Sequence, residues 1–252
     1  MEKEIKTEEK PEEIKKVSTK KQDFGIELKD MVDAGVYYGH RTSRIHPKMK
    51  PYISGTKSTT HIIDLEKTII YFNEALKYIK DIISEDKVLL FIGTKVHVKK
   101  IVEEIAKECG LPYINERWLG GTFTNFETIK KRIDYFKDLE KKKETGELQK
   151  YTKKERLDID KELVKLEIKF GGIKKLEKLP DAIFVIDMRK DNLAIKEARK
   201  KGIKVVSIAD TNVDPTLADY PIPANDDAIS SVTYILNKVK EAILENKSKV
   251  SK

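Results

Sequence analysis

The chain has 252 residues, of which 37% are charged, and its 51 Lys and Arg against 43 Asp and Glu give a net charge of +8. This length suits one large domain or a domain with an insertion, and the basic balance favours a polyanionic partner such as nucleic acid or a membrane surface. A single cysteine, Cys109, excludes an intramolecular disulfide and a cysteine-based zinc cluster. No apolar run approaches the ~20 residues that span a bilayer, and no secretory signal is visible, so we expect a cytosolic protein.

Residues 1–24 contain seven Lys and seven Asp or Glu with few apolar side chains. Such a segment cannot bury enough apolar surface to offset the entropy lost on ordering, so we predict a disordered charged extension.

A basic segment follows a short helix predicted over residues 26–34. Between positions 34 and 63 there is no acidic residue, and tyrosines are interleaved with the basic side chains of the run RTSRIHPKMKPYISGTK at 41–57. Its two prolines and its glycine predict an irregular loop. Basic and aromatic residues on a loop suit phosphate contacts and stacking on RNA, although an ordinary solvated loop explains the pattern equally well.

Alternating elements follow, and they indicate an α/β protein. Apolar residues at helical spacing predict helices, and continuous apolar runs predict buried strands. The predicted helices cover residues 65–83, 98–105, 193–199 and 229–243; the predicted strands cover 61–64, 87–92, 112–114, 181–187, 205–209 and 220–222. This order predicts a mainly parallel, doubly wound sheet with helices on both faces.

The run RWLGGTFTN at 117–125 interrupts this alternation and contains the only tryptophan, Trp118. The adjacent pair Gly120 and Gly121 permits a sharp change of direction, and Thr124 and Glu127 have the spacing of a capping box. We interpret the run as a structural junction, with Trp118 packing the turn and the glycines forming the bend. The alternative is a buried tryptophan on an ordinary tight turn.

Residues 125–178 change in character. Apolar side chains repeat at spacings of three and four in two stretches, and Thr152 and Glu155 have the spacing of a second capping box. Between positions 126 and 180 there are seventeen Lys and Arg but only twelve Asp and Glu. We predict an antiparallel coiled-coil helical hairpin inserted into the α/β domain. The α/β domain then comprises residues 25–124 and 179–246, and 247–252 form a frayed tail.

Ligands of doubly wound sheets bind at the carboxyl ends of the strands, which invites a nucleotide-binding or dehydrogenase interpretation. No G-x-G-x-x-G or G-x-x-x-x-G-K-[ST] sequence occurs, and the four histidines form no H-E-x-x-H pair. His40 and His46 share the basic segment, where cation repulsion disfavours a metal. Asp187 and Asp210 are candidates for a shared divalent cation, although strand-end aspartates more often cap loops. We therefore predict no enzyme activity, no cofactor and no small-molecule substrate.

Several ordered motifs together resemble the bacterial small-ribosomal-subunit protein number two family. They are AGVYYGHRTSRIHPKMKPYI (34–53), HIIDLEKT (61–68), LLFIGTK (89–95), RWLGGTFTN (117–125), FGGIKKLEKLPDAIFVID (170–187), AIKEA (194–198), DTN (210–212) and IPANDDAI (222–229). The resemblance covers residues 26–246. It implies a flavodoxin-like domain with a coiled-coil hairpin, bound to small-subunit ribosomal RNA between head and body on the solvent side. It also implies a non-catalytic role in translation and contacts with other small-subunit proteins, in some bacteria the largest one.

Two positions depart from the family pattern. Ala224 stands where the family has glycine, which puts the local backbone in question. Glu116 stands where histidine is common, which puts one polar contact in question.

Residue chemistry and the resemblance together give a set of RNA-binding candidates. Asn125 is also a candidate helix cap. Lys130, Lys131 and Arg132 are consecutive on a helix, so they cannot all meet one RNA strand. The candidates are Arg41, Arg44, Lys48, Lys50, Lys95, Arg117, Asn125, Lys130 and Lys131.

Three functional hypotheses remain at this point. The leading one is a structural, ribosome-bound protein that binds small-subunit rRNA. The second is a nucleotide-dependent enzyme on the same sheet. The third is an adaptor whose hairpin binds only proteins, which deletion of residues 126–178 would test.

Overall fold

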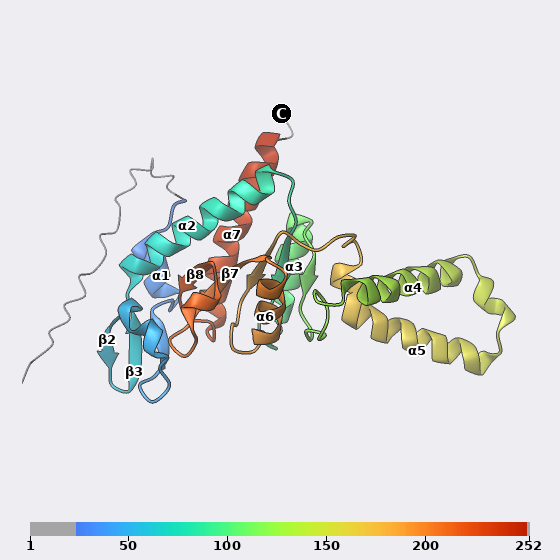
Figure 1. Ribbon diagram of the computed structural model, residues 1–252, viewed down its shortest axis with the longest axis horizontal. Helices are drawn as coiled ribbons and strands as arrows, with labels where there is room; N and C mark the ends of the chain where they lie inside the picture. The colour runs from blue at the N-terminus through green and yellow to red at the C-terminus, as the bar shows by residue number, and fades with distance from the viewer. Residues whose placement is uncertain (1–23, 251–252) are drawn as a thin grey trace, which may run out of the picture.

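A five-stranded parallel sheet forms the centre of the computed structural model, which describes residues 24–250 and side chains as far as residue 247 (Figure 1). Its strands are β4 (Leu89–Ile92), β5 (Tyr113–Ile114), β6 (Ala182–Val185), β7 (Lys204–Ala209) and β8 (Tyr220–Pro223). They lie in the order β5-β4-β6-β7-β8, and every adjacent pair is parallel. Counted along the chain from β4 this is the order 2-1-3-4-5 of flavodoxin-like sheets. The predicted α/β class is confirmed.

Both faces of this sheet are covered, which is why its central strands are continuous apolar runs. All four residues of β4 and of β6 are buried. Leu89 and Phe91 of β4 belong to one apolar core, whereas Leu90 and Ile92 belong to the other. Because successive side chains of a strand point to opposite faces, each strand contributes residues to both cores.

One core lies under α2 (Leu65–Ser84), α3 (Lys99–Cys109) and α7 (Ile229–Val250), and the other lies under α6 (Asn192–Lys200). Helix α2 begins at Asp64, whose carboxylate accepts hydrogen bonds from the Glu66 and Lys67 amides. Helix α3 ends at Gly110, which has a φ of 63°. The start of α2 agrees with the predicted helix over 65–83, and α3 extends beyond the predicted 98–105 to Cys109.

Helix α7 corrects the predicted frayed tail, because it runs to Val250. The Asn246 amide donates to the Lys80 carbonyl at 2.7 Å, and Lys247 Nζ donates to the Cys109 carbonyl at 2.6 Å. These contacts with α2 and α3 hold the last turns against the domain. The predicted extension over residues 1–24, apart from Phe24, lies outside the described residues; the Phe24 ring packs against the first core, beneath Lys80 Nζ.

The basic segment is more regular than predicted. It lies between α1 (Leu28–Asp33) and α2 and contains β1 (Tyr38–Arg41), the 3-10 helix η1 (Pro47–Tyr52), β2 (Ile53–Lys57) and β3 (Thr60–Ile63). The three strands form an antiparallel sheet in the order β1-β3-β2. The expectation of an irregular loop was wrong because both prolines fall in η1, while Gly55 pairs with Ile62 beside a shift in register.

A helical hairpin projects from the α/β domain (Figure 1). It consists of α4 (Phe126–Glu144), η2 (Glu147–Lys150), α5 (Lys153–Phe170) and η3 (Gly171–Ile173). The capping box of Thr152 and Glu155 is confirmed. The box of Thr124 and Glu127 is wrong: α4 has Asn125 as its N-cap, with no side-chain capping bond.

The hairpin continues the second core rather than forming a separate one. Ile133 and Phe136 of α4 and Leu163, Leu166 and Phe170 of α5 belong to the same cluster as β4 and β6. The coiled-coil character of this packing and the domain boundaries stay predictions. The 3-10 helix η4 (Pro215–Leu217) precedes β8. Over residues 24–250 none of the helices combines the length and apolarity of a membrane span.

We predict that Gly172→Ala destabilises the protein. A Cβ atom at Gly172 would lie 2.1 Å from the Tyr113 carbonyl oxygen, so η3 or β5 must shift. Overpacking of this kind costs about 1–3 kcal/mol. Urea unfolding measures the loss, and Gly55→Ala is the control because nothing lies within 4 Å of its added Cβ. Equal midpoints for the two variants would contradict the close approach.

Candidate nucleic-acid interface

The basic segment is anchored to the carboxyl end of β7 through Thr211. The His40 amide donates to Thr211 Oγ1 at 2.9 Å, and the His46 amide donates to the Thr211 carbonyl at 2.8 Å. A Cβ at Gly39 would lie 2.5 Å from Thr211 Cγ2, so only glycine allows this approach. The DTN motif therefore fixes the small sheet against the large one.

The four cations predicted in this segment are all exposed. Arg41 and Arg44 line one cavity of about 440 Å³, so the structure brings these two together. Lys48 is partly engaged: its Nζ lies 2.8 Å from Asp214 Oδ2 and 2.9 Å from Thr216 Oγ1. Burial raises the pKa of Asp214, but the bonds from Lys48 and Thr216 outweigh it and lower that pKa to about 2. A phosphate near Lys48 would compete with this carboxylate.

The junction is built around Trp118 as the sequence suggested. The indole is 7% exposed and packs edge-on against Phe123, with ring centroids 4.7 Å apart. Gly121 has a φ of 92°, so it supplies the bend, whereas Gly120 has an ordinary φ. Arg117, beside the buried indole, is exposed. The role of anchor for Trp118 and of bend for Gly121 is consistent with these contacts.

The sequence analysis missed the group that organises this junction, the carboxylate of Glu197 on α6. Its Oε1 accepts from Trp118 Nε1 at 3.2 Å and from the Gly121 amide at 2.8 Å. Its Oε2 accepts from the Phe123 amide at 3.0 Å, and from the amide and hydroxyl of Thr124 at 3.1 and 3.2 Å. One side chain therefore satisfies five donors of the loop that leads into the hairpin. Thr124 is used here, which is why it does not form the predicted capping box.

The charge on Glu197 is stabilised by these bonds. The side chain is 6% exposed, and burial raises the pKa of a carboxylate. The donors from Gly121, Thr124, Phe123 and Trp118 outweigh burial, so the pKa lies below its ordinary value of 4.5. Glu197 is therefore ionised across the neutral range.

Lys95 lies at the carboxyl end of β4, next to the point where the strand order reverses, and it is enclosed by carboxylates. Its Nζ lies 3.0 Å from Asp187, 2.8 Å from Asp226 and 2.8 Å from Asp227. Burial lowers the pKa of Lys95, but the three carboxylates outweigh it and raise that pKa above its ordinary value. The role of Lys95 as an RNA ligand stays a prediction, and its ammonium is already paired with an internal acidic cluster.

This cluster also fills the place where doubly wound folds bind nucleotides. Burial raises the pKa of Asp226 to about 7 and that of Asp191 to about 6. The Thr94 hydroxyl donates to Asp191 at 2.9 Å, and Asp187 accepts from the amides of Arg189 and Lys190. Carboxylates that repel each other and bind one lysine offer no cradle for phosphate. The enzyme interpretation therefore gains nothing from the structure.

His40 also contacts acidic side chains at this edge of the sheet. Its Nδ1 lies 3.0 Å from Asp210 and its Nε2 lies 3.3 Å from Asp227, so the side chain faces acids rather than the basic segment. The hydrogen bond to Asp210 raises the pKa of His40 although burial lowers it. His40, Asp210 and Asp227 form a trio that can hold a metal ion, since their ligand atoms lie within 4.8 Å of one another. Of the two predicted metal candidates Asp210 belongs to this trio, and Asp187 binds Lys95 instead.

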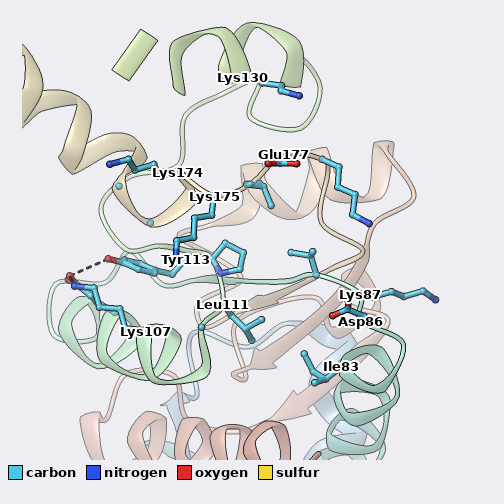
Figure 2. Close-up of a pocket in the computed structure, with 18 of the residues that line it drawn as sticks. Ile83, Asp86, Lys87, Lys107, Leu111, Tyr113, Lys130, Lys174, Lys175 and Glu177 are labelled. Atoms are coloured by element: carbon cyan, nitrogen blue, oxygen red, sulfur yellow. Dashed lines mark hydrogen bonds and ion pairs between the residues drawn. The ribbon is translucent and has the colours of Figure 1, made fainter. Parts of the chain in front are cut away.

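The predicted residues of the hairpin are exposed. Asn125 Oδ1 accepts from the Thr128 hydroxyl at 2.9 Å, a contact within the first turn of α4. Lys130 lines a groove of about 1010 Å³ between the hairpin base and the α/β domain. Figure 2 shows Lys130 on the hairpin side of this groove and Lys107 on the domain side. Lys131 is exposed on the next position of the helix.

The candidates therefore form two separate groups. Arg41, Arg44, Lys48 and Lys50 lie with the small sheet at one end of the long axis, and Lys130 and Lys131 lie on the hairpin towards the other (Figure 1). Arg117 lies in the loop that joins the sheet to the hairpin. An RNA contacting both groups must extend along the molecule.

Comparisons with known proteins agree with this architecture. The family model described as ribosomal protein S2 matches residues 31–246. The chain belongs to the ribosomal protein S2 family. It is 47% identical to a protein of a Nitratiruptor species named small ribosomal subunit protein uS2, over 88% of this chain and 83% of that protein. The protein of the same name from Dictyoglomus thermophilum is also 47% identical, over 88% of this chain and 90% of that protein.

The two departures from the family pattern are accommodated. Glu116 forms an ion pair with Lys99 of α3. Ala224 is buried in the first core, and Ser58 and Asp86 are the only non-glycine residues with positive φ in the part of the chain that the structure describes. Alanine at position 224 therefore needs no strained backbone.

We predict that Glu197→Gln destabilises the protein by about 2 kcal/mol or more at pH 7. An amide replaces one acceptor oxygen with a donor, which leaves buried donors of the junction unpaired. Because the pKa of Glu197 is lowered, its contribution to stability is complete above 4.5 and is lost as the pH falls through the folded-state pKa. Unfolding free energies of the two proteins should therefore converge in acid.

Urea unfolding at a series of pH values measures this difference. The exposed Glu104→Gln is the matched control and should behave like the unaltered protein at every pH. A Glu197→Gln variant with unchanged stability at pH 7 would show that the carboxylate does not hold the junction.

Proposed function

We propose that this chain is a structural, non-catalytic component of the small ribosomal subunit that binds small-subunit rRNA. Membership of the ribosomal protein S2 family is the observation that carries the proposal. The proposal places the chain on cytoplasmic ribosomes, next to other small-subunit proteins, in some bacteria the largest one.

Within this proposal the principal RNA contacts are the exposed cations of the small sheet and the junction. The side chains of Arg41, Arg44 and Lys50 form no ion pair with another residue of the part that the structure describes, and Arg117 is exposed in the same way. Arginine provides bidentate donors for phosphate, and lysine provides a mobile point charge. Lys48 can bind a phosphate of the RNA once its ammonium releases the Asp214 carboxylate. Secondary contacts come from the hairpin residues Lys130, Lys131 and Asn125.

A structural role for Lys95 is part of the same proposal. Lys95 follows β4, and its three carboxylate partners follow β6 or precede α7. These ion pairs join the elements at the edge of the sheet where Thr211 anchors the basic segment. The proposal therefore removes Lys95 from the set of RNA ligands.

We predict that Arg41→Gln, Arg44→Gln and Lys50→Gln together weaken binding to small-subunit rRNA and flatten its salt dependence. Each lost phosphate contact removes roughly 0.7–0.9 from the slope of log K against log salt. Filter binding or co-sedimentation over a series of KCl concentrations measures the slope. Lys77→Gln, Lys200→Gln and Lys201→Gln change the net charge equally on other exposed surfaces and should leave the slope near that of the unaltered chain.

Two results would contradict the proposal. The first is a triple variant that binds with an unchanged slope, which would place the contacts elsewhere. The second is specific thermal stabilisation by a mononucleotide or dinucleotide, which would revive the enzyme hypothesis.

A further inference from the structure

Helix α5 has two apolar faces, and only one of them is covered. Leu163, Leu166 and Phe170 face the hairpin core. On the opposite side of the helix, Leu157, Val164 and Ile168 are 53%, 60% and 54% exposed. We call these three residues the outer stripe of α5.

The three side chains of the outer stripe are aligned along one side of the helix. Its spacings of seven and four residues place all three side chains within about 40° of one another around a helix with 3.6 residues per turn. It extends about 16 Å along the helix at ~1.5 Å per residue. Isolated exposed apolar residues need no explanation, but an aligned aliphatic stripe marks an interaction surface.

A shallow groove adjoins the stripe. Val164 and Ile168 form one wall of a cavity of about 290 Å³ that also exposes parts of Phe136 and Leu163 between α4 and α5. Two of the charged side chains beside this groove are already paired, since Lys143 binds Asp160 at 2.7 Å and Glu140 binds Lys174. A partner that covers these two side chains therefore does not have to desolvate an unpaired charge.

The other edge of the stripe is basic. Lys154, Lys161, Lys165 and Lys169 follow one another along this side of α5 and are all exposed. Within the described residues only Lys161 of these four forms an ion pair, with Asp158 at 3.8 Å, which is a weak surface pair. The partner must therefore present an apolar surface beside a row of negative charge.

We propose that the outer stripe of α5 docks an amphipathic helix of a neighbouring protein, with acidic side chains along the edge that faces Lys161 and Lys165. Aliphatic side chains offer RNA neither charge nor a stacking surface, whereas a helix laid along a stripe buries them. The hairpin then has an RNA-facing side on α4, with Lys130 and Lys131, and a protein-facing side on α5. This inference rests on the proposed function, because the partner is a protein of the same particle.

Photo-crosslinking in assembled small subunits tests the proposal. Small subunits are purified with a benzophenone amino acid at position 164 of the full chain, and a second set carries it at position 131 as a control. We expect the adduct from position 164 to survive ribonuclease and to map to a helical peptide of another protein with apolar spacing of three and four residues and net negative charge. The adduct from position 131 should be sensitive to ribonuclease.

Charge reversal makes the test specific. Lys161→Glu with Lys165→Glu should lower the yield of the protein adduct from position 164 at least fivefold. Arg156→Ser, which removes an exposed charge of α5 outside the basic row, should leave it unchanged. Sedimentation of the variant chain with small subunits reports the proposed function separately. If that sedimentation persists, a ribonuclease-sensitive adduct, a link to a second copy of this chain, or no adduct at position 164 overturns the docking inference alone.

Discussion

The carboxylate of Glu197 is the contact on which the arrangement of the two parts of this protein depends. A chain that leaves a parallel sheet, builds a projecting hairpin and returns must satisfy the backbone donors of the loop at the point of departure. Here one buried side chain on α6 accepts from three amides, one indole and one hydroxyl of that loop. Charged acceptors make stronger bonds than neutral ones, so the hairpin is oriented by electrostatics as well as by the packing of Trp118.

The placement of charge also distinguishes this sheet from those of nucleotide-binding enzymes that share its strand order. The edge of the sheet at which ligands bind is occupied by Lys95 and its carboxylate partners, and His40 joins the neighbouring acids to the small sheet. The predicted cations that are exposed lie elsewhere, on the small sheet, the junction and the hairpin. The internal lysine pairs with carboxylates, and the exposed lysines and arginines of the small sheet and junction are the ones that we propose contact rRNA.

Local patterns predicted most of the fold. Apolar periodicity located α2, α3, α7 and the central strands, and the motif of Thr152 and Glu155 located the start of α5, because these features depend on neighbours in the chain. The errors arose where partners are distant in the chain. The small sheet depends on pairing between Tyr38 of β1 and Ile62 of β3, and the end of α7 depends on contacts with α2 and α3. Periodicity reveals neither.

The candidate site likewise combines features set by local sequence with features set by distant partners. Exposed arginines and lysines could be chosen from charge alone, but the roles of Lys95, His40 and Glu197 come from partners far away in the chain, such as Asp226, 131 positions from Lys95. The motif AIKEA contained the only signal for Glu197, a lone acid on an otherwise apolar helix face.

Amide hydrogen exchange of Gly121, Phe123 and Thr124 tests most directly the central claim that the Glu197 carboxylate holds the junction. In Glu197→Gln these three amides should exchange at least tenfold faster at neutral pH while the amides of β4 keep their protection; unchanged exchange at the three positions would contradict the account.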